Sequence, residues 1–166
     1  MALSNASTNT AEALVDRELV ITRVFDAPRE LIWDAWTDPK QIVNWWGPRG
    51  FTTTIRKMDV QPGGIWDYTM HGPDGTDFPS RAVFREVVKP SRIVYSLEGG
   101  KADDRTVQIE TTWTFEIQGK QTFLTLHMIF PSAEVKEHVV KNYGAIEGGH
   151  QTLDRLREHL AKSFTI

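Results

Sequence analysis

Between residues 51 and 130 the sequence predicts six short strands in succession, and this run restricts the possible folds most strongly. The segments alternate apolar and polar residues and are rich in β-branched and aromatic side chains, as half-buried strands are. Short turn sequences such as Gly72-Pro73-Asp74-Gly75 separate them, which leaves no room for crossover helices. The run therefore predicts an antiparallel meander with one covered and one exposed face. The strands are expected at 51–58, 65–70, 81–88, 92–98, 105–118 and 120–130.

A further strand and two short helices are predicted ahead of this run. Residues 18–25 alternate in the same way, and Pro28 then suits the first turn of a helix that ends before Pro39. Asp26 is expected to cap this helix, because a side-chain carboxylate can accept from its free N–H groups. A second short helix is expected at 40–45.

Two helices are predicted after the strands, one from Ser132 to Asn142 and a longer one over 145–162. The longer helix carries an apolar stripe at spacings of three and four residues, made of Ile146, Gly149, Leu153, Leu156 and Leu160. Only this helix is long enough to cover the concave face of a curved sheet. The sequence therefore predicts an α+β fold in which an antiparallel sheet wraps a long C-terminal helix.

The length of 166 residues suits one domain, expected over 17–163, and the small polar residues 1–16 predict a flexible tail. The net charge of −3 comes with scattered Lys and Arg, which argues against nucleic-acid binding. There is no cysteine and therefore no disulfide or thiolate metal site. No segment approaches the roughly 20 apolar residues of a membrane span, and no signal peptide is apparent. A cytoplasmic protein is expected.

Tryptophans are concentrated in one part of the chain. Four of the six lie within the fourteen residues 33–46, as Trp33, Trp36, Trp45 and Trp46. Each brings a large apolar area and one N–H donor that needs a partner when buried. This density predicts an aromatic wall around a pocket or on a docking surface. The segment from Trp45 to Pro48 serves either as a structural corner or as a gate at the mouth of that pocket.

The interior predicted between sheet and helix is aromatic as well. Trp66, Tyr68 and Met70 share one strand face, and Trp113 lies on the apolar face of another strand. These side chains either line a cavity or simply fill it. The residues expected to bind a ligand are Trp36, Trp46, Trp66, Tyr68, Met70, Glu86, Tyr95, Trp113, Met128, Gly149, His150 and Leu153.

Two of these residues are polar candidates. Glu86 shares the strand parity of Phe84 and Val88, so it is expected inside, either oriented toward a ligand or paired with Arg81 or Arg56. His150 either points inward as a polar contact or lies on the helix surface. The five histidines show no metal-ligand spacing, and no nucleophile elbow, dinucleotide fingerprint or P-loop is present. No catalytic residue, metal or cofactor is predicted.

Six motifs in order resemble stand-alone bacterial Aha-type proteins, homologues of the activator of the heat-shock chaperone ATPase, in the SRPBCC or START-like superfamily. The motifs are Phe25-Asp26-Ala27-Pro28, Trp33-Asp34-Ala35-Trp36-Thr37-Asp38-Pro39, Trp45-Trp46-Gly47-Pro48, Pro62-Gly63-Gly64, His71-Gly72-Pro73-Asp74-Gly75 and Gln151-Thr152-Leu153-Asp154-Arg155-Leu156. The resemblance covers about Glu18 to Leu160 and implies a helix-grip fold with a ligand pocket between helix and sheet. Many relatives carry Gly-Trp where this chain has Gly148-Gly149, which predicts a roomier pocket.

Three functions follow as hypotheses. The first is a non-enzymatic carrier or sensor that binds a hydrophobic, lipid-like small molecule between the sheet and the C-terminal helix. The second, which the resemblance alone implies, is a chaperone cofactor or stress-response module with a protein partner. The third is a cyclase- or hydrolase-type enzyme that uses Glu86 or His150 as its acid–base group. The chain is expected to be a monomer or a homodimer.

Overall fold

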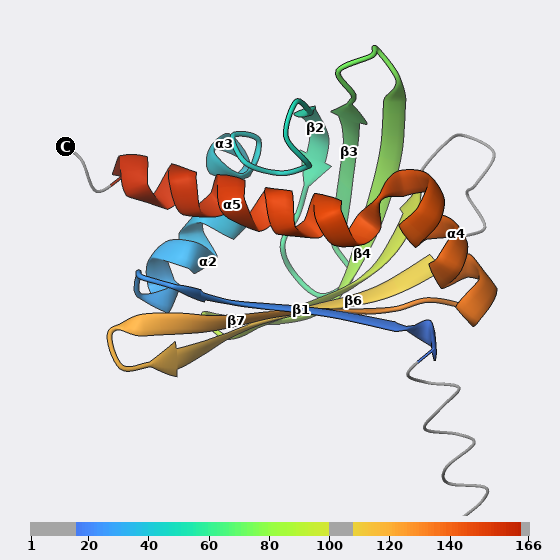
Figure 1. The fold of residues 1–166 in the computed structure, drawn as a ribbon. Helices are drawn as coiled ribbons and strands as arrows, with labels where there is room; N and C mark the ends of the chain where they lie inside the picture. Colours follow the sequence, from blue (N-terminus) through green and yellow to red (C-terminus); the bar gives the residue numbers. More distant parts are fainter. Residues whose placement is uncertain (1–15, 100–107, 164–166) are drawn as a thin grey trace, which may run out of the picture.

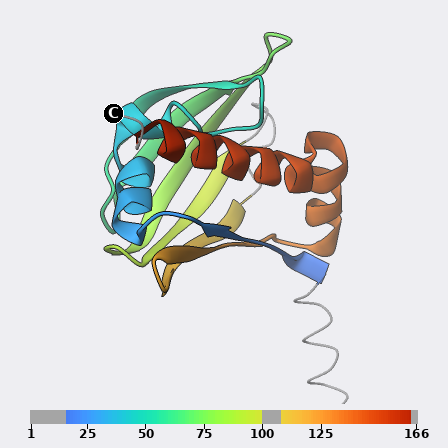
Figure 2. The ribbon, with the colours of Figure 1, turned by 60° about the vertical axis from the view of Figure 1, so that its left-hand side comes forward.

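A computed structural model describes residues 16–99 and 108–163 of the chain. Seven antiparallel strands form one sheet in the order β1-β7-β6-β5-β4-β3-β2. The sheet curves, and the long helix α5 (Ala145–Ser163) crosses its inner face, with two short helices at one end and α4 at the other (Figure 1). The turned view shows the same arrangement of helix over sheet (Figure 2). This is the α+β helix-grip fold that the sequence predicts.

The strands match their predicted positions closely. Only β4 differs much, because its pairing with β3 continues past Pro79 to the register pair His71–Asp77 and lengthens the hairpin. The turn at residues 72–76 closes this hairpin, as predicted, with Asp74 accepting a hydrogen bond from the Thr76 backbone N–H (3.0 Å). The predicted strand positions 51, 120 and 130 fall outside the observed strands, and positions 105–107 lie outside the described residues. The strands are β1 (Glu18–Phe25), β2 (Thr52–Met58), β3 (Ile65–His71), β4 (Asp77–Val88), β5 (Arg92–Gly99), β6 (Gln108–Gln118) and β7 (Gln121–Ile129).

The helices also follow the sequence, with differences at their ends. The expected Asp26 cap is wrong, because α2 (Arg29–Thr37) begins after Pro28 without a side-chain cap. Asp38 instead caps the next helix, α3 (Pro39–Ile42), by accepting from the Lys40 N–H. This helix ends three residues earlier than predicted, and residues 43–45 form a turn from which Trp45 and Trp46 enter the core. Ser132 caps α4 (Ala133–Tyr143) as predicted.

The core lies between the inner face of the sheet and helices α2 and α5. From α5 it takes Leu153, Leu156 and Leu160, all buried, as the apolar stripe predicts. Ile146 departs from that prediction, because its side chain is 43% exposed and Ala145 packs instead against a second, smaller cluster. That smaller cluster is formed by Leu19, Ile109 and Phe130.

The glycine pair of α5 marks two close approaches to the helix. A Cβ atom at Gly149 would lie 2.5 Å from Ile21 Cδ1 of β1, and one at Gly148 would lie 3.2 Å from Pro48 Cγ. The space beside Gly149 is therefore filled by Ile21, which is buried in the main cluster. The expectation of a roomier pocket at this pair is wrong: the missing side chains allow β1 and the loop at Pro48 to pack against the helix.

This packing gives a testable coupling between Gly149 and Ile21. Gly149→Ala is expected to destabilise the fold by about 1 kcal/mol, because overpacking costs about 1–3 kcal/mol and the gain in helix propensity offsets about 1 kcal/mol of it. In an Ile21→Val background, which removes Cδ1, the same substitution should be neutral or stabilising. Urea denaturation of the four proteins measures this coupling. The cost of Gly148→Ala should be unaffected by Ile21→Val, and equal costs of Gly149→Ala in both backgrounds would contradict the assignment.

Candidate functional site

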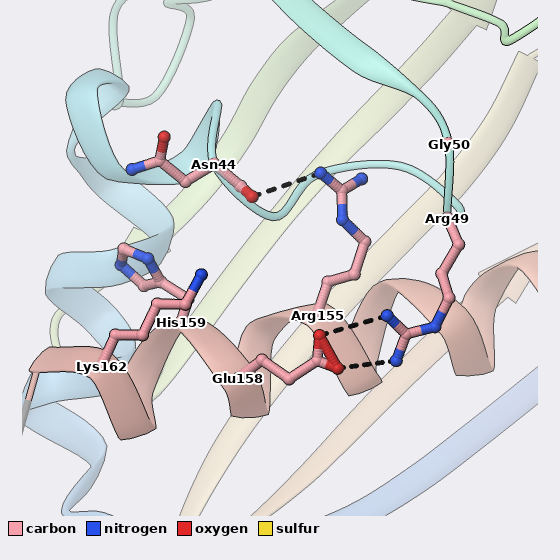
Figure 3. A pocket seen from close by; sticks show the side chains of 7 residues that line it. All are labelled: Asn44, Arg49, Gly50, Arg155, Glu158, His159 and Lys162. Atoms are coloured by element: carbon pink, nitrogen blue, oxygen red, sulfur yellow. Dashed lines mark hydrogen bonds and ion pairs between the residues drawn. The ribbon is translucent and has the colours of Figure 1, made fainter.

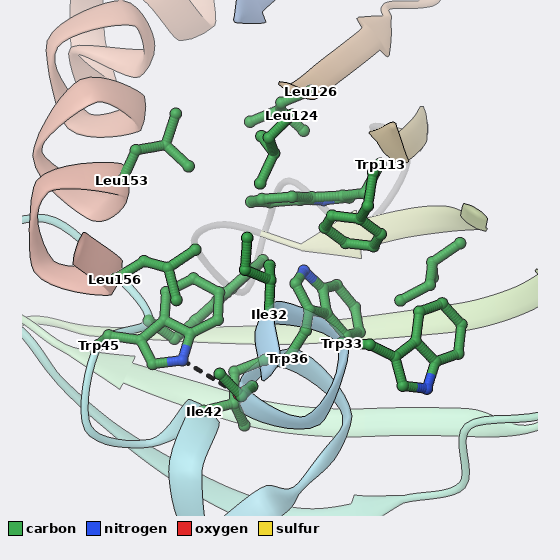
Figure 4. Packing of buried hydrophobic residues seen from close by; sticks show 14 of the residues in the cluster. Ile32, Trp33, Trp36, Ile42, Trp45, Trp113, Leu124, Leu126, Leu153 and Leu156 are labelled. Atoms are coloured by element: carbon green, nitrogen blue, oxygen red, sulfur yellow. Dashed lines mark hydrogen bonds between the residues drawn. The ribbon is translucent and has the colours of Figure 1, made fainter. Parts of the chain in front are cut away.

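An aromatic cluster fills the space between the sheet, α2 and the loop of residues 43–51, which we call the tryptophan loop. Trp36 from α2 lies at its centre, with ring centroids 5.3 Å from Trp66 and 5.7 Å from Trp46. The tryptophan loop adds Trp45, whose ring centroid lies 5.5 Å from that of Trp46. Most of these pairs are edge-to-face, an arrangement that aromatic quadrupoles favour. Figure 4 shows Trp36, Trp45 and Trp113 packed in one cluster with side chains such as Ile32, Leu124 and Leu156.

Only some of the indole N–H groups in the cluster have a hydrogen-bond partner. Trp45 Nε1 donates to the Ala35 carbonyl (3.1 Å), and Trp113 Nε1 donates to the Tyr95 hydroxyl (3.1 Å). The indole N–H groups of Trp36 and Trp66 are buried and have no hydrogen-bond partner among the described residues. An unpaired buried donor costs about 1–3 kcal/mol, and an N–H contact with a ring face returns only a small part of that.

The two tyrosine hydroxyls of the cluster keep their protons at neutral pH. Burial raises the pKa of Tyr68 to about 12, although its hydrogen bonds with the side chains of Trp46 and Ser80 act in the opposite direction. Burial raises the pKa of Tyr95 even more than that of Tyr68, although the hydrogen bond from Trp113 acts in the opposite direction. Both hydroxyls can therefore donate as well as accept. The centre of the core is thus richer in donors than in acceptors.

Most residues predicted to bind a ligand meet in this cluster. Leu153 of α5 belongs to the same cluster, and Met70 and Met128 are half-buried side chains packed against it. Gly149 borders the cluster, in contact with Ile21 as described above. The six aromatic residues among them are buried together: Trp36, Trp46, Trp66, Tyr68, Tyr95 and Trp113.

The interior placement expected for Glu86 is wrong. A bulge between Phe84 and Glu86 shifts the pairing of β4 with β5, so the alternation of inner and outer side chains is reset there. Val87 packs against the core, and Glu86 is exposed and paired with Arg92 at 3.2 Å, neither with Arg81 nor with Arg56. The prediction assumed that side chains alternate strictly along this strand, and the sequence does not show where a bulge adds a residue.

His150 lies at the boundary between α5 and β1, where it meets Arg23. Its Nδ1 atom is 3.3 Å from Nη2 of Arg23, which also donates to the His150 carbonyl and pairs with Asp154 through Nη1. The hydrogen bond from Arg23 is the main cause that lowers the pKa of the Asp154 carboxyl. Because three strands separate β1 from β4, His150 and Glu86 do not share a site.

Arg155 is not part of the apolar stripe of α5, and its side chain joins the helix to the tryptophan loop. Its guanidinium Nη1 donates to the carbonyls of Trp46 (3.3 Å), Gly47 (2.8 Å) and Pro48 (3.1 Å), and Nη2 donates to that of Asn44 (3.2 Å). Burial, followed by the charge of Arg49, lowers the pKa of Arg155. This one side chain therefore ties the tryptophan loop to the helix.

A pocket of about 520 Å³ lies beside this contact, on the outer side of α5, and sequence reasoning missed it. Figure 3 shows it between the tryptophan loop and the C-terminal half of the helix. The signal in the sequence is a polar stripe at positions i, i+3, i+4 and i+7, which puts four side chains on one helix face. Its lining residues are Asn44, Arg49, Gly50, Arg155, Glu158, His159 and Lys162.

Residues 16–99 and 108–163 contain no group of three or more His, Asp or Glu side chains placed to hold a metal ion. None of the described helices combines the length and the apolar character required to span a membrane.

Over residues 26–161 the chain matches the protein family described as "Activator of Hsp90 ATPase homolog 1-like protein". Among solved structures, a protein from Mycobacterium smegmatis is 28% identical with a TM-score of 0.78, and the match covers 87% of this chain and 91% of that protein. A protein from Arthrobacter aurescens is 25% identical with a TM-score of 0.82, covering 90% of this chain and 88% of that one. The AHSA1 protein from Silicibacter pomeroyi, 21% identical with a TM-score of 0.73 and coverage of 88% and 99%, shares the fold. No curated protein matches the chain.

Proposed function

Because this chain belongs to the family of Activator of Hsp90 ATPase homolog 1-like proteins, we propose that it binds a small apolar molecule within its aromatic core. The molecule carries one hydrogen-bond acceptor, such as a carbonyl oxygen, and is bound without being chemically changed. Its rings or alkyl groups contact the tryptophans, and its acceptor meets the donors at the centre of the cluster. The protein acts in this proposal as a carrier or sensor.

The observation that carries the proposal is the pair of unpaired indole N–H groups on Trp36 and Trp66. Their ring centroids lie 5.3 Å apart, so both unpaired donors belong to the same part of the core, where the ligand's acceptor is proposed to lie. The Tyr95 hydroxyl belongs to the same group, since its ring lies 5.9 Å from Trp36 and 6.2 Å from Trp66. Polar groups that converge inside an apolar site are what fixes the orientation of a small ligand. This centre favours acceptors over donors.

The route inward leads past Trp46. Its side chain is 8% exposed, the most of the six tryptophans, and it belongs to the tryptophan loop. The cluster is closely packed, so a ligand enters only when Trp46 moves outward with that loop. The hydrogen bonds from Arg155 to the loop carbonyls resist this movement and keep the loop closed over the core.

The test uses two probes of nearly the same shape, acetophenone and ethylbenzene, which differ in a carbonyl oxygen. Acetophenone is expected to bind about tenfold more tightly, because one added hydrogen bond to an otherwise unpaired donor contributes about 1 kcal/mol or more. Quenching of tryptophan fluorescence and chemical shifts of the indole N–H protons follow binding. Trp66→Phe, which deletes one donor and keeps an aromatic ring, should remove most of the preference for the carbonyl.

Trp33→Phe is the matched control, because Trp33 lies on the same helix as Trp36 but contacts Phe115 at the edge of the cluster. It should leave the preference for acetophenone unchanged. The proposal is wrong if neither probe binds, if the two bind equally, or if Trp66→Phe and Trp33→Phe act alike. Unshifted indole resonances of Trp36 and Trp66 at saturating acetophenone would also contradict it.

A further inference from the structure

The pocket on the outer side of α5 has a local charge opposite to that of the whole chain. The chain has a net charge of −3. The pocket nevertheless contains the cationic side chains of Arg49, Arg155 and Lys162 and only one carboxylate, that of Glu158. Burial, followed by the nearby charge of Lys162, lowers the pKa of His159, which therefore adds little positive charge at neutral pH. A concave surface with an excess of positive charge attracts anions.

One cation of this pocket, Arg49, is already paired with a carboxylate of the same chain, Glu158. Glu158 accepts two hydrogen bonds from Arg49, at 3.1 and 2.6 Å, in the fork geometry that carboxylates and phosphates share (Figure 3). Both side chains are about half exposed, 52% for Arg49 and 49% for Glu158. Ion pairs as exposed as this one contribute little to stability, because water and salt screen them. An anion from solution that binds Arg49 more strongly than Glu158 can therefore displace it at little cost.

Arg155 supplies a second cation that does not need to be released. Its recorded partners are backbone carbonyls, and it forms no ion pair with any carboxylate of the described residues. Those carbonyls fix the guanidinium in place, so its charge is oriented before any ligand arrives. A fixed cation lowers the entropy cost of binding an anion, because no long side chain has to be ordered.

We propose that this pocket binds the phosphate group of a small phosphate monoester, with Arg49 exchanging Glu158 for the phosphate and Arg155 and Lys162 adding positive charge. The volume lies within the range of about 300–1,000 Å³ that small-molecule sites occupy. A carboxylate ligand would offer Arg49 only what Glu158 already provides from the same chain. A phosphate offers nearly two negative charges and three acceptor oxygens, and it can therefore win that competition.

The test is a titration of the full chain with inorganic phosphate at constant ionic strength and pH, followed by backbone amide chemical shifts. Phosphate should shift the amides of residues 44–50 and 155–162, and sodium acetate at the same concentrations should not. Glu158→Gln removes the internal competitor and should tighten phosphate binding about three- to fivefold, because the ion pair that it breaks is weak. Arg49→Gln should weaken binding about tenfold, as expected for the loss of one charge-assisted contact.

A matched pair of controls lies on the sheet. Arg85 of β4 and Glu110 of β6 form a similarly exposed ion pair, with 3.1 Å between Nε and Oε1, and neither residue lines the pocket. Arg85→Gln and Glu110→Gln change the net charge in the same ways and should leave phosphate binding unchanged. The proposal is overturned if Glu158→Gln fails to tighten binding, if acetate binds as well as phosphate, or if the shifts spread over the surface without favouring the pocket.

Discussion

Replacing Arg155 with methionine is expected to lower the free energy of unfolding by about 3 kcal/mol, since hydrogen bonds to a charged group contribute about 1.5–3 kcal/mol and are not additive. The methionine keeps the apolar stem and loses the donors. Four carbonyls of the tryptophan loop lose this partner at once, and that of Gly47 has the shortest bond, 2.8 Å. Urea denaturation measures the loss, and the slope of the transition should stay unchanged.

Arg157→Met is the matched control for this prediction. Arg157 lies two residues along the same helix, is 64% exposed and pairs with Asp154 at 3.5 Å. Its replacement should cost less than about 0.5 kcal/mol, as exposed ion pairs do. A second measurement is hydrogen exchange of the Trp46 and Phe51 amides, which bond to carbonyls within or beside the loop. If Arg155→Met and Arg157→Met cost the same, or if exchange at these amides is unchanged, Arg155 does not hold the loop.

The Arg155 contact also links stability to the proposed binding. If the tryptophan loop is the entrance, weakening its attachment to α5 should speed both entry and release of acetophenone. The equilibrium affinity should change much less than the rates, because Arg155 contacts the loop backbone and belongs to no part of the aromatic cluster. A local opening of low free energy is the usual means by which a packed core exchanges with solvent.

The architecture could be predicted because local sequence patterns and global topology agree. Alternating strands with short turns leave only an antiparallel meander, and one long amphipathic helix must cover its inner face. For the tryptophan-rich segment the sequence allowed either a pocket wall or a docking surface, and the structure buries its four tryptophans in the core. Local patterns do not show where a strand departs from its regular alternation of inner and outer side chains. The bulge beside Glu86 inverts the side-chain alternation, so that residue lies outside although its parity predicts the interior.

Two further features depend on contacts between distant segments. The glycines at 148 and 149 look like missing volume in the sequence, yet Pro48 and Ile21 occupy that volume from segments far away in the chain. Arg155 looks like a solvent-facing residue by helical period, and the loop that meets it lies about a hundred positions earlier. A single sequence specifies these residues but not that they meet. For the same reason the polar stripe of α5 did not by itself indicate a pocket.

Trp36→Ala is expected to cost about 4–5 kcal/mol, at the upper end for large-to-small changes in a core. Trp36 is fully buried, and its ring lies within 6.2 Å of five others, from Trp66 at 5.3 Å to Phe84 at 6.2 Å. Its removal leaves a cavity at the meeting point of α2, the tryptophan loop and four strands, β3 to β6. Because natural domains are stable by only about 5–15 kcal/mol, this variant should be close to unfolding at room temperature.

Trp33→Ala, a substitution on the same helix, distinguishes the stability that comes from ring contacts in the cluster from the stability that comes from burial alone. Trp33 is also buried, but among the described residues its only recorded ring partner is Phe115, with centroids 6.1 Å apart. Both substitutions remove the same apolar area, so a difference between them measures the ring contacts, which contribute about 0.5–1.5 kcal/mol per pair and less when they share one ring. Trp36→Ala should therefore be more destabilising than Trp33→Ala by at least about 1 kcal/mol. Equal losses would mean that the centre of the cluster is held by burial alone, and that its aromatic geometry serves some purpose other than stability.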